Sequence, residues 1–270
     1  MTIANGLVLL ASTKDAIRIK LSLPKSAPFS QYASYITQLL PPAQLFKNNE
    51  QGVWYDPSDI SSMYQDAAMT IPVTANGDPI GAMMDLSGNG NHATQTVSAS
   101  RPTYQTDGIL HWLAFDGVDD FIKSSGFLRT TPHVIAFGMM FGVNSATGKF
   151  CDSRENNNAA SFYRYEDGRV RLGTAEGSPS YSLFTTSDII NDNNYVFSGF
   201  FNGGQSELQV DGAKYVGNLS SDSVDGITLG SSPVNSEYIN GRIYGVVCVN
   251  GTPDNDKITQ YLAQKSGVTL

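Results

Sequence analysis

The sequence predicts a mainly β protein built as an antiparallel two-sheet sandwich, with a short helical segment before it and a short helix after it. From Trp112 onward the chain divides into short β-rich runs separated by turn signals. No long helical period lies between these runs, which favours antiparallel sheets over parallel sheets crossed by helices. A composition with 40% hydrophobic, 10% aromatic and 16% charged residues is typical of a globular chain. The roughly 220 residues after the N-terminal piece suit one all-β domain with a full core.

The N-terminal residues 1–48 follow a different pattern and predict a helical attachment segment. Two short amphipathic helices are expected, one ending before Pro24 and one before Pro41. Helices this short are marginal in water on their own, so the segment needs a partner surface. The Pro-containing stretch 40–49 is the expected linker to a domain over residues 49–270.

The strands are predicted from turn residues as much as from hydrophobic runs. Glu166-Asp167-Gly168 is typical of a hairpin turn, because Asp and Gly tolerate positive φ. A second hairpin is expected around Asn202-Gly203-Gly204. The main strands are expected over residues 133–143, 161–165, 169–173, 195–201, 205–210, 213–216, 226–229 and 239–249. The closing helix is expected to be capped by Thr252, to start at Pro253 and to end at Gly267.

Four blocks between Val53 and Ile122 carry a resemblance to a known type of domain. They read VWYDPSDISSMYQD, PVTANGDPIGAMMDLSGNGNHATQ, ASRPTY and LAFDGVDDFI. Together with ITLG, GRI and a terminal helix near the end of the chain, they resemble the laminin-G-like (concanavalin-A-like) jelly rolls of bacteriophage tail-fibre and virion proteins. The resemblance covers about residues 52–270 and implies a jelly-roll sandwich. A Trp that is usual in the first central strand of relatives is missing from IAFGMMFG, which puts the subfamily in question more than the fold.

Charge is unevenly distributed along the chain. The net charge is −8, with +4 on residues 1–48 and therefore −12 on the remainder. An acidic domain repels phosphates, so we expect no nucleic-acid binding there. The basic segment either docks on an acidic protein surface or is a solvated helix face. No apolar run is long enough to span a bilayer and no convincing secretory signal is present, so no membrane insertion is expected.

The two cysteines, Cys151 and Cys248, do not have the spacing of a zinc site. Cys248 lies in a β-rich run and is expected to be a buried free thiol. A disulfide between the two stays open as an alternative, although it is unexpected in a protein assembled in a reducing cytoplasm.

Two glycine-containing loops concentrate oxygen-bearing side chains and predict a calcium site. The residues concerned are Asp85, Asn89, Asn91, Asp116, Asp119 and Asp120. Calcium prefers several oxygen ligands, which flexible loops of this composition can supply. The alternative is turn chemistry, in which Asp and Asn bond to their own backbone. Calcium is the only cofactor the sequence suggests.

A polar loop and several tyrosines predict carbohydrate binding. Sugars are bound by aromatic rings against their C–H faces and by polar groups that bond to hydroxyls. The predicted ligand-binding residues are Arg154, Asn156, Asn157, Tyr163, Tyr165 and Tyr181. The alternative for each strand tyrosine is ordinary half-buried packing in a sheet.

No catalytic motif is recognisable, so the chain is expected not to be an enzyme. None of the six glutamates lies in the E-x-D-x-x-E motif of sandwich glycosidases, which places carboxylates on one face of a strand. The three histidines, His92, His111 and His133, lack a metal spacing, and no G-x-S-x-G turn is present. Each histidine is expected to be a surface or hydrogen-bonding residue.

The function that these observations and the resemblance imply is that of a phage virion protein, a tail fibre or adhesin assembled in the host cytoplasm. Residues 1–48 are expected to dock on other virion proteins, and the jelly roll is expected to bind a host-surface glycan or another surface component. By family analogy we expect a homo-oligomer, a trimer, in which weak sugar sites gain from avidity. One alternative is a structural virion component, a capsid decoration or neck protein, without a receptor role. A polysaccharide depolymerase is the less favoured alternative.

Overall fold

The structure is a computed structural model that describes residues 42–142, 148–154, 161–174, 181–219, 224–234 and 236–270. The chain divides into two compact units, residues 1–41 and residues 42–270. The helices predicted before Pro41 lie outside the described residues. The second unit begins seven residues before the predicted boundary, because the 3-10 helix η1 (Pro42–Phe46) buries Phe46 against the sandwich.

The first sheet contains eight strands among the described residues, and all its pairings are antiparallel. Its strand order is β16 (Ala213–Gly217), β15 (Ser206–Val210), β14 (Asn194–Phe201), β9 (His133–Phe141), β19 (Asn240–Asn250), β6 (His111–Asp116) and β5 (Thr103–Thr106), with β1 (Gly52–Tyr55) also paired to β19. We call it sheet A. The long strands β9 and β19, both predicted as strands, pair with each other at its centre.

The second sheet, sheet B, contains nine strands in the part of the chain that is described. Its order is β13 (Tyr181–Phe184), β12 (Val170–Thr174), β11 (Ser161–Arg164), β10 (Gly148–Asp152), β18 (Thr228–Leu229), β7 (Ile122–Ser124), β4 (Ala93–Thr94), β3 (Ala82–Met83) and β2 (Met63–Tyr64). A small separate pair joins β8 (Leu128–Arg129) to β17 (Val224–Asp225). Three further 3-10 turns are η2 (Ile60–Ser62), η3 (Ser98–Ser100) and η4 (Gly203–Gln205).

The core between the sheets is filled by aromatic rings. Phe137 of β9 lies edge-on to Phe150 of β10 and Phe162 of β11, with ring centroids 5.1 and 4.6 Å apart. Edge-to-face pairs of this kind add to the free energy gained by burying the rings. Both cysteines are buried and free, so the prediction of a buried free thiol at Cys248 is confirmed.

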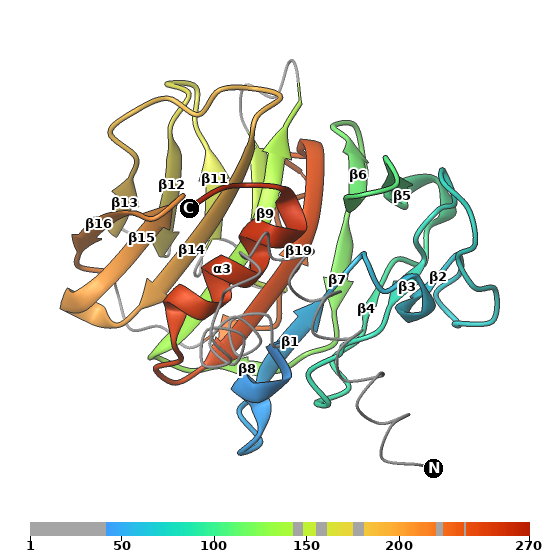
Figure 1. The fold of residues 1–270 in the computed structure, drawn as a ribbon, viewed down its shortest axis with the longest axis horizontal. Helices are drawn as coiled ribbons and strands as arrows, with labels where there is room; N and C mark the ends of the chain where they lie inside the picture. Colours follow the sequence, from blue (N-terminus) through green and yellow to red (C-terminus); the bar gives the residue numbers. More distant parts are fainter. Residues whose placement is uncertain (1–41, 143–147, 155–160, 175–180, 220–223, 235) are drawn as a thin grey trace, which may run out of the picture. The chain divides into compact units, whose positions relative to one another are not determined.

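All nine residues of β9 are buried because both faces of the strand are covered. One face carries Phe137 and looks into the sandwich. The other carries small residues under helix α3 (Asn255–Ser266), and a Cβ on Gly138 would lie only 3.0 Å from the Cβ of Ser266. This close helix contact leaves no room for a large side chain at Gly138. Figure 1 shows α3 lying across the outer side of sheet A.

Helix α3 begins two residues after the predicted start. Asp254, not Thr252, caps it by accepting a hydrogen bond from the Lys257 N–H, and Gly267 ends it with φ of 71° as predicted. Ile258, Tyr261 and Leu262 form its buried face. The predicted fold class is confirmed: two antiparallel sheets with one short C-terminal helix. No helix in the described ranges has the length and apolar character needed to cross a membrane.

A buried polar network fixes α3 to β1. The Trp54 indole N–H donates to the Tyr261 hydroxyl at 3.0 Å, and that hydroxyl donates to the Asp56 carboxylate at 2.7 Å. The Lys265 ammonium lies 2.8 Å from the same carboxylate. Burial raises the pKa of Asp56, but the Lys265 charge and the hydrogen bonds from Lys265, Ser58 and Tyr261 outweigh it, and the net pKa is lowered.

Candidate functional site

The first predicted calcium loop, residues 85–91, is occupied by its own hydrogen bonds. The Asp85 carboxylate accepts from the N–H groups of Trp54, Ser87 and Asn91 and from the Ser87 hydroxyl, all at 2.7–3.0 Å. These four bonds use the four acceptor positions of a carboxylate. The side-chain amides of Asn89 and Asn91 both donate to the Gly52 carbonyl. Hydrogen bonds within the loop, as the turn alternative predicts, and hydrogen bonds to β1 therefore account for these three side chains.

The second loop brings the carboxylates of Asp116, Asp119 and Asp120 together, with one oxygen from each within 4.8 Å of the others. Burial, together with the charge of Asp116, raises the pKa of Asp120 to about 7. Such a cluster is stabilised by a proton or a cation, and its donors are the hard oxygens that calcium prefers. Asp116 also accepts the Val118 N–H, Asp119 the Ser100 hydroxyl and Asp120 the Asp116 N–H, so turn chemistry accounts for part of this loop as well. These three carboxylates could hold a cation together, and the calcium ion stays a prediction.

The three histidines have different surroundings, and His133 departs from what the sequence predicts. His92 Nδ1 accepts the Asp85 N–H at 2.9 Å, and His111 Nδ1 lies 2.7 Å from the Tyr104 hydroxyl. His133 is instead fully buried, its ring nitrogens have no hydrogen bond of good geometry among the described residues, and the ring stacks on Phe201 with centroids 4.6 Å apart. Burial, with the nearby Arg129 charge, lowers the pKa of His133 well below its usual range.

The predicted polar loop is described only at its start. Arg154 lies 3.4 Å from the Asp225 carboxylate of β17, and its backbone N–H donates to the Asp225 carbonyl at 2.7 Å. These contacts join the end of β10 to the β8–β17 pair. Asn156 and Asn157 lie outside the described residues, as does the side chain of Tyr181.

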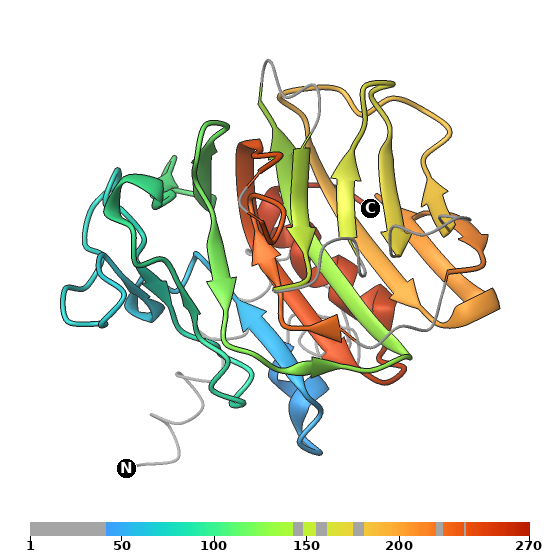
Figure 2. The same cartoon turned by 180° about the vertical axis from the view of Figure 1, so that it is seen from behind.

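Two other predicted residues, Tyr163 and Tyr165, lie on the outer side of sheet B. Phe162 and Leu172 point into the core, so their strand neighbours point outward. The pairing places Tyr163 opposite Arg171, and Arg171 opposite Phe184. Figure 2 shows β11, β12 and β13, in yellow, on the side of the sandwich away from α3. We call the outward group Tyr163, Tyr165, Arg169, Arg171 and Phe184 the aromatic–arginine face.

Arginine and aromatic side chains contact one another across this face. The Arg171 guanidinium lies 4.4 Å from the centre of the Tyr165 ring and 5.9 Å from that of Phe184. The Arg169 guanidinium lies 5.8 Å from the centre of the Phe184 ring. Tyr165 and Phe184 are nevertheless 47% and 45% exposed. These rings are therefore held in place by guanidinium groups while one side of each is open to solvent.

The ring of Tyr163 lies over Gly173 of the neighbouring strand β12. A Cβ on Gly173 would lie 3.2 Å from Cε1 of Tyr163, so the ring covers the glycine. Burial raises the pKa of Tyr163, and the nearby charges of Arg171 and Lys149 oppose that rise. Lys149 is itself buried and paired to Asp152 at 3.0 Å. Tyr163 thus forms a rigid side of the face next to a fixed cation.

Sequence reasoning missed Arg169, Arg171 and Phe184. The sequence feature that could have identified the two arginines is the hairpin turn at residues 166–168, which brings Arg169 and Arg171 beside Tyr165 and Tyr163. Phe184 comes from a third strand, and only the pairing of β12 with β13 shows that it belongs to the face.

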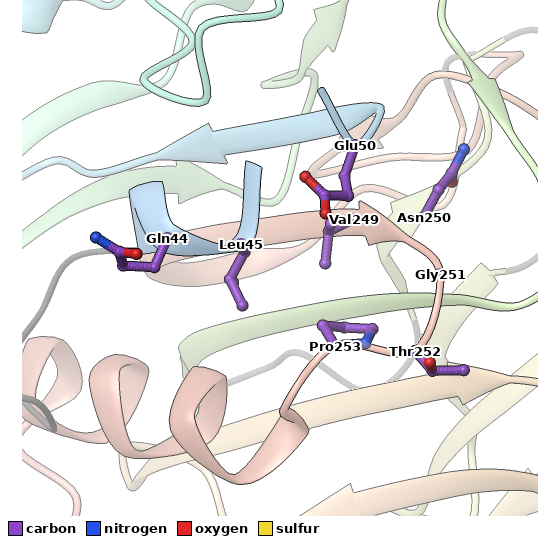
Figure 3. Close-up of a pocket in the computed structure, with 8 residues that line it drawn as sticks. All are labelled: Gln44, Leu45, Glu50, Val249, Asn250, Gly251, Thr252 and Pro253. Carbon is purple, nitrogen blue, oxygen red and sulfur yellow. The ribbon is translucent and has the colours of Figure 1, made fainter. Parts of the chain in front are cut away.

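A separate hollow of about 280 Å³ lies between η1, the end of β19 and the turn before α3. Figure 3 shows its lining, which is Gln44, Leu45, Glu50, Val249, Asn250, Gly251, Thr252 and Pro253. Its one charged side chain, Glu50, accepts hydrogen bonds from Asn48. The hollow has no aromatic ring and no gathering of charged groups, so it is a weaker candidate than the aromatic–arginine face.

Comparison with known proteins identifies a shared fold. No family model and no curated protein matches the chain. Trypanosoma rangeli sialidase in complex with sialic acid is similar with a TM-score of 0.54 and 11% identity, over 88% of this chain and 38% of that one. The same sialidase with 2,3-difluorosialic acid gives 0.53 and 12%, over 83% and 35%. The botulinum neurotoxin type G receptor binding domain gives 0.49 and 11%, over 71% and 51%. The chain thus spans less than two fifths of either sialidase chain.

The expectation that the chain is not an enzyme is overturned by these comparisons. Structures that share its sandwich are sialidases, which are enzymes. The expectation was drawn from a missing carboxylate motif, and sialidases with a Tyr nucleophile are exceptions to the paired-carboxylate scheme. A missing motif therefore excludes no activity in chains with this fold. At such low identity the likeness shows the fold alone and assigns no catalytic residue to this chain.

Proposed function

We propose that the chain is a carbohydrate-binding β-sandwich module whose ligand binds on the aromatic–arginine face. The observation that carries the proposal is the pair of half-exposed rings, Tyr165 and Phe184, held by Arg171 on an outer sheet surface. Sugar rings have C–H faces that pack on aromatic rings, and hydroxyls that accept hydrogen bonds from guanidinium groups. The face offers both kinds of contact within a few ångströms.

The sheet is suited to hold such a site. Arg171 and Phe184 lie on strands and Tyr165 directly follows β11, and side chains on strands are positioned more rigidly than side chains on loops. The rings of Tyr165 and Phe184 are restrained by Arg171, so little conformational entropy is lost when a sugar packs on them. The two sialidase structures that share the fold contain sialic acid and 2,3-difluorosialic acid, which is in keeping with the proposal.

We extend the proposal to the biological setting that the sequence resemblance implies. The module serves a phage virion protein of the tail-fibre or adhesin type, with residues 1–48 docking on other virion proteins. It is a homo-oligomer, and several weak sugar sites on one particle bind a host surface together. The support for the virion setting is the set of sequence blocks between Val53 and Ile122.

A glycan array probed with the full chain tests the proposal. Wild type is expected to bind a subset of bacterial surface glycans, and the double substitution Tyr165→Ala with Phe184→Ala is expected to abolish that binding. Ile109→Ala is the matched control, because it truncates an 84% exposed apolar side chain elsewhere. Binding that survives the double substitution would remove the aromatic–arginine face from the proposal. Firm incorporation into virions without glycan binding would favour the alternative of a structural virion component.

A further inference from the structure

We infer that the ligand of the aromatic–arginine face is an acidic glycan, and that Arg169 binds the carboxylate of one of its sugars. This inference rests on the proposed function and names the class of sugar. It comes from a difference between the two arginines of the face, which lie two residues apart and point to the same side of the sheet.

Arg171 is a paired cation. Its Nη2 lies 2.7 Å from the Asp167 carboxylate, and its guanidinium packs on Tyr165. The Asp167 carboxylate also accepts the Arg169 backbone N–H at 3.1 Å. Burial raises the pKa of Asp167, but its bonds and charge interactions with Arg171 and Arg169 lower it overall. Arg171 therefore has its counter-charge within the protein and is left to position Tyr165.

Arg169 interacts with the Asp167 charge only at a distance. Its guanidinium lies against the exposed Phe184 ring, and the described residues contain no carboxylate in ion-pair contact with it. Its Nε, like that of Arg171, is shielded from solvent and makes no hydrogen bond in the described part of the chain, so the two arginines differ in their ion pairing and not at Nε. A carboxylate can accept two hydrogen bonds from the Nη groups of a guanidinium without an ion pair of its own, and such charge-assisted bonds are stronger than neutral ones. The neighbouring Phe184 would then contact the sugar ring that carries the carboxylate.

The surrounding charges indicate a single carboxylate instead of a dense polyanion. Three exposed carboxylates surround Arg169: Glu166 and Asp167 precede it by three and two residues, and Asp188 lies against Gly168, the residue before it. The whole chain carries a net charge of −8. Closely spaced sulfates or phosphates would be repelled by these groups. A glycan that presents a single carboxylate to this face can bind Arg169 without placing further negative charges beside the acidic residues. Uronic and sialic acids both have this chemistry.

Direct binding measurements with matched sugar probes test the inference. The probes are the methyl glycoside of galacturonic acid and sialyllactose, which have one carboxylate each, as the free acid and as the methyl ester, which keeps the ring and removes the charge. The full chain is expected to bind at least one free acid about tenfold more tightly than its ester, the size of one charge-assisted hydrogen-bonded contact. Arg169→Gln is expected to lose that tenfold preference, and Arg169→Lys is expected to retain part of it because it keeps the charge without the fork.

Lys214→Gln is the control, since it removes an exposed cation on β16 and changes the net charge equally. It is expected to leave both affinities unchanged. Equal affinity for acid and ester, or an equal loss for both with Arg169→Gln, would overturn the inference. If uncharged glycans bind and the binding depends on Tyr165, the proposed function stands while the acidic ligand is excluded. If no glycan of either kind binds, the proposed function fails together with the inference.

Discussion

The outer faces of the two sheets differ in what covers them. Outside sheet A, residues such as Val134, Ala136 and Val247 pack under α3 and are buried. Outside sheet B, at β11–β13, the corresponding positions hold Tyr165 and Phe184, with rings that are about half exposed. On sheet A, where a helix covers the strands, the outward side chains are small and apolar. On sheet B at β11–β13, where solvent covers the strands, the outward side chains are aromatic rings and guanidinium groups. The difference indicates that one face stabilises the fold and the other is available for a ligand.

The covered face predicts a large loss of stability when its central contact is removed. Leu262 of α3 is fully buried and lies close to Gly245 of β19. Leu262→Ala should lower the free energy of unfolding by about 3 kcal/mol, because it leaves a cavity that the strands beneath cannot fill. Urea unfolding of the full chain measures this, with Ile109→Ala as the exposed control at less than about 0.5 kcal/mol. A loss for Leu262→Ala as small as the control's would show that α3 is not what stabilises sheet A.

The polar network between α3 and β1 predicts a pH-dependent loss. Asp56→Asn should lower the free energy of unfolding at pH 7 by about 2 kcal/mol, because it leaves the Lys265 ammonium without its buried partner. The folded-state pKa of Asp56 is lowered, so its contribution is full above the unfolded pKa near 4 and is lost as the pH falls through the folded value. Thermal unfolding from pH 7 to pH 2 should therefore show the wild type and the variant converging in acid. A constant difference across that range would contradict this account.

The effect of calcium on thermal unfolding distinguishes the two loops that were predicted to bind it. If calcium binds Asp116, Asp119 and Asp120, a concentration of about one hundred times its Kd raises the free energy of unfolding by about 2.7 kcal/mol. We expect Asp119→Asn to abolish most of the resulting rise in Tm. Asp85→Asn should lower stability without calcium and leave the calcium response intact, because Asp85 bonds to the backbone of its own loop and of β1. The same calcium response in wild type and Asp119→Asn would remove the cluster as a metal site.

The sequence predicted the fold better than the site because the two depend on different information. Local turn chemistry and hydrophobic runs were enough to place the 161–173 hairpin, the long strands β9 and β19, and the closing helix. The shortest strands, such as β2 and β3, have two residues each and leave too little pattern to recognise. Tyr163 and Tyr165 could be predicted as aromatic candidates. Their neighbour Phe184 could not, because its place is fixed by strand register between residues distant in sequence.

The two loops predicted to bind calcium show the same difference between what local sequence determines and what strand assembly determines. Asp85 and Asp116 both lie in loops rich in Asp, Asn and Gly, and sequence composition does not separate them. The difference is which donors surround each carboxylate once the strands have assembled. Asp85 meets the Trp54 N–H from a strand 31 residues earlier, whereas Asp116 meets two other carboxylates.

Removing Tyr165 should change binding far more than stability, which is the reverse of what we expect for Leu262. Tyr165 is 47% exposed, and its main described contact is the Arg171 guanidinium, a pairing worth about 0.5–1 kcal/mol at an exposed site. Tyr165→Ala should therefore lower the free energy of unfolding by less than about 1 kcal/mol. Loss of an aromatic contact to a sugar should weaken glycan affinity about tenfold. Urea unfolding and titration calorimetry on the same sample compare the two effects. A stability loss near that of Leu262→Ala, with unchanged affinity, would mean that the exposed rings brace the sheet, and that both outer faces serve the fold alone.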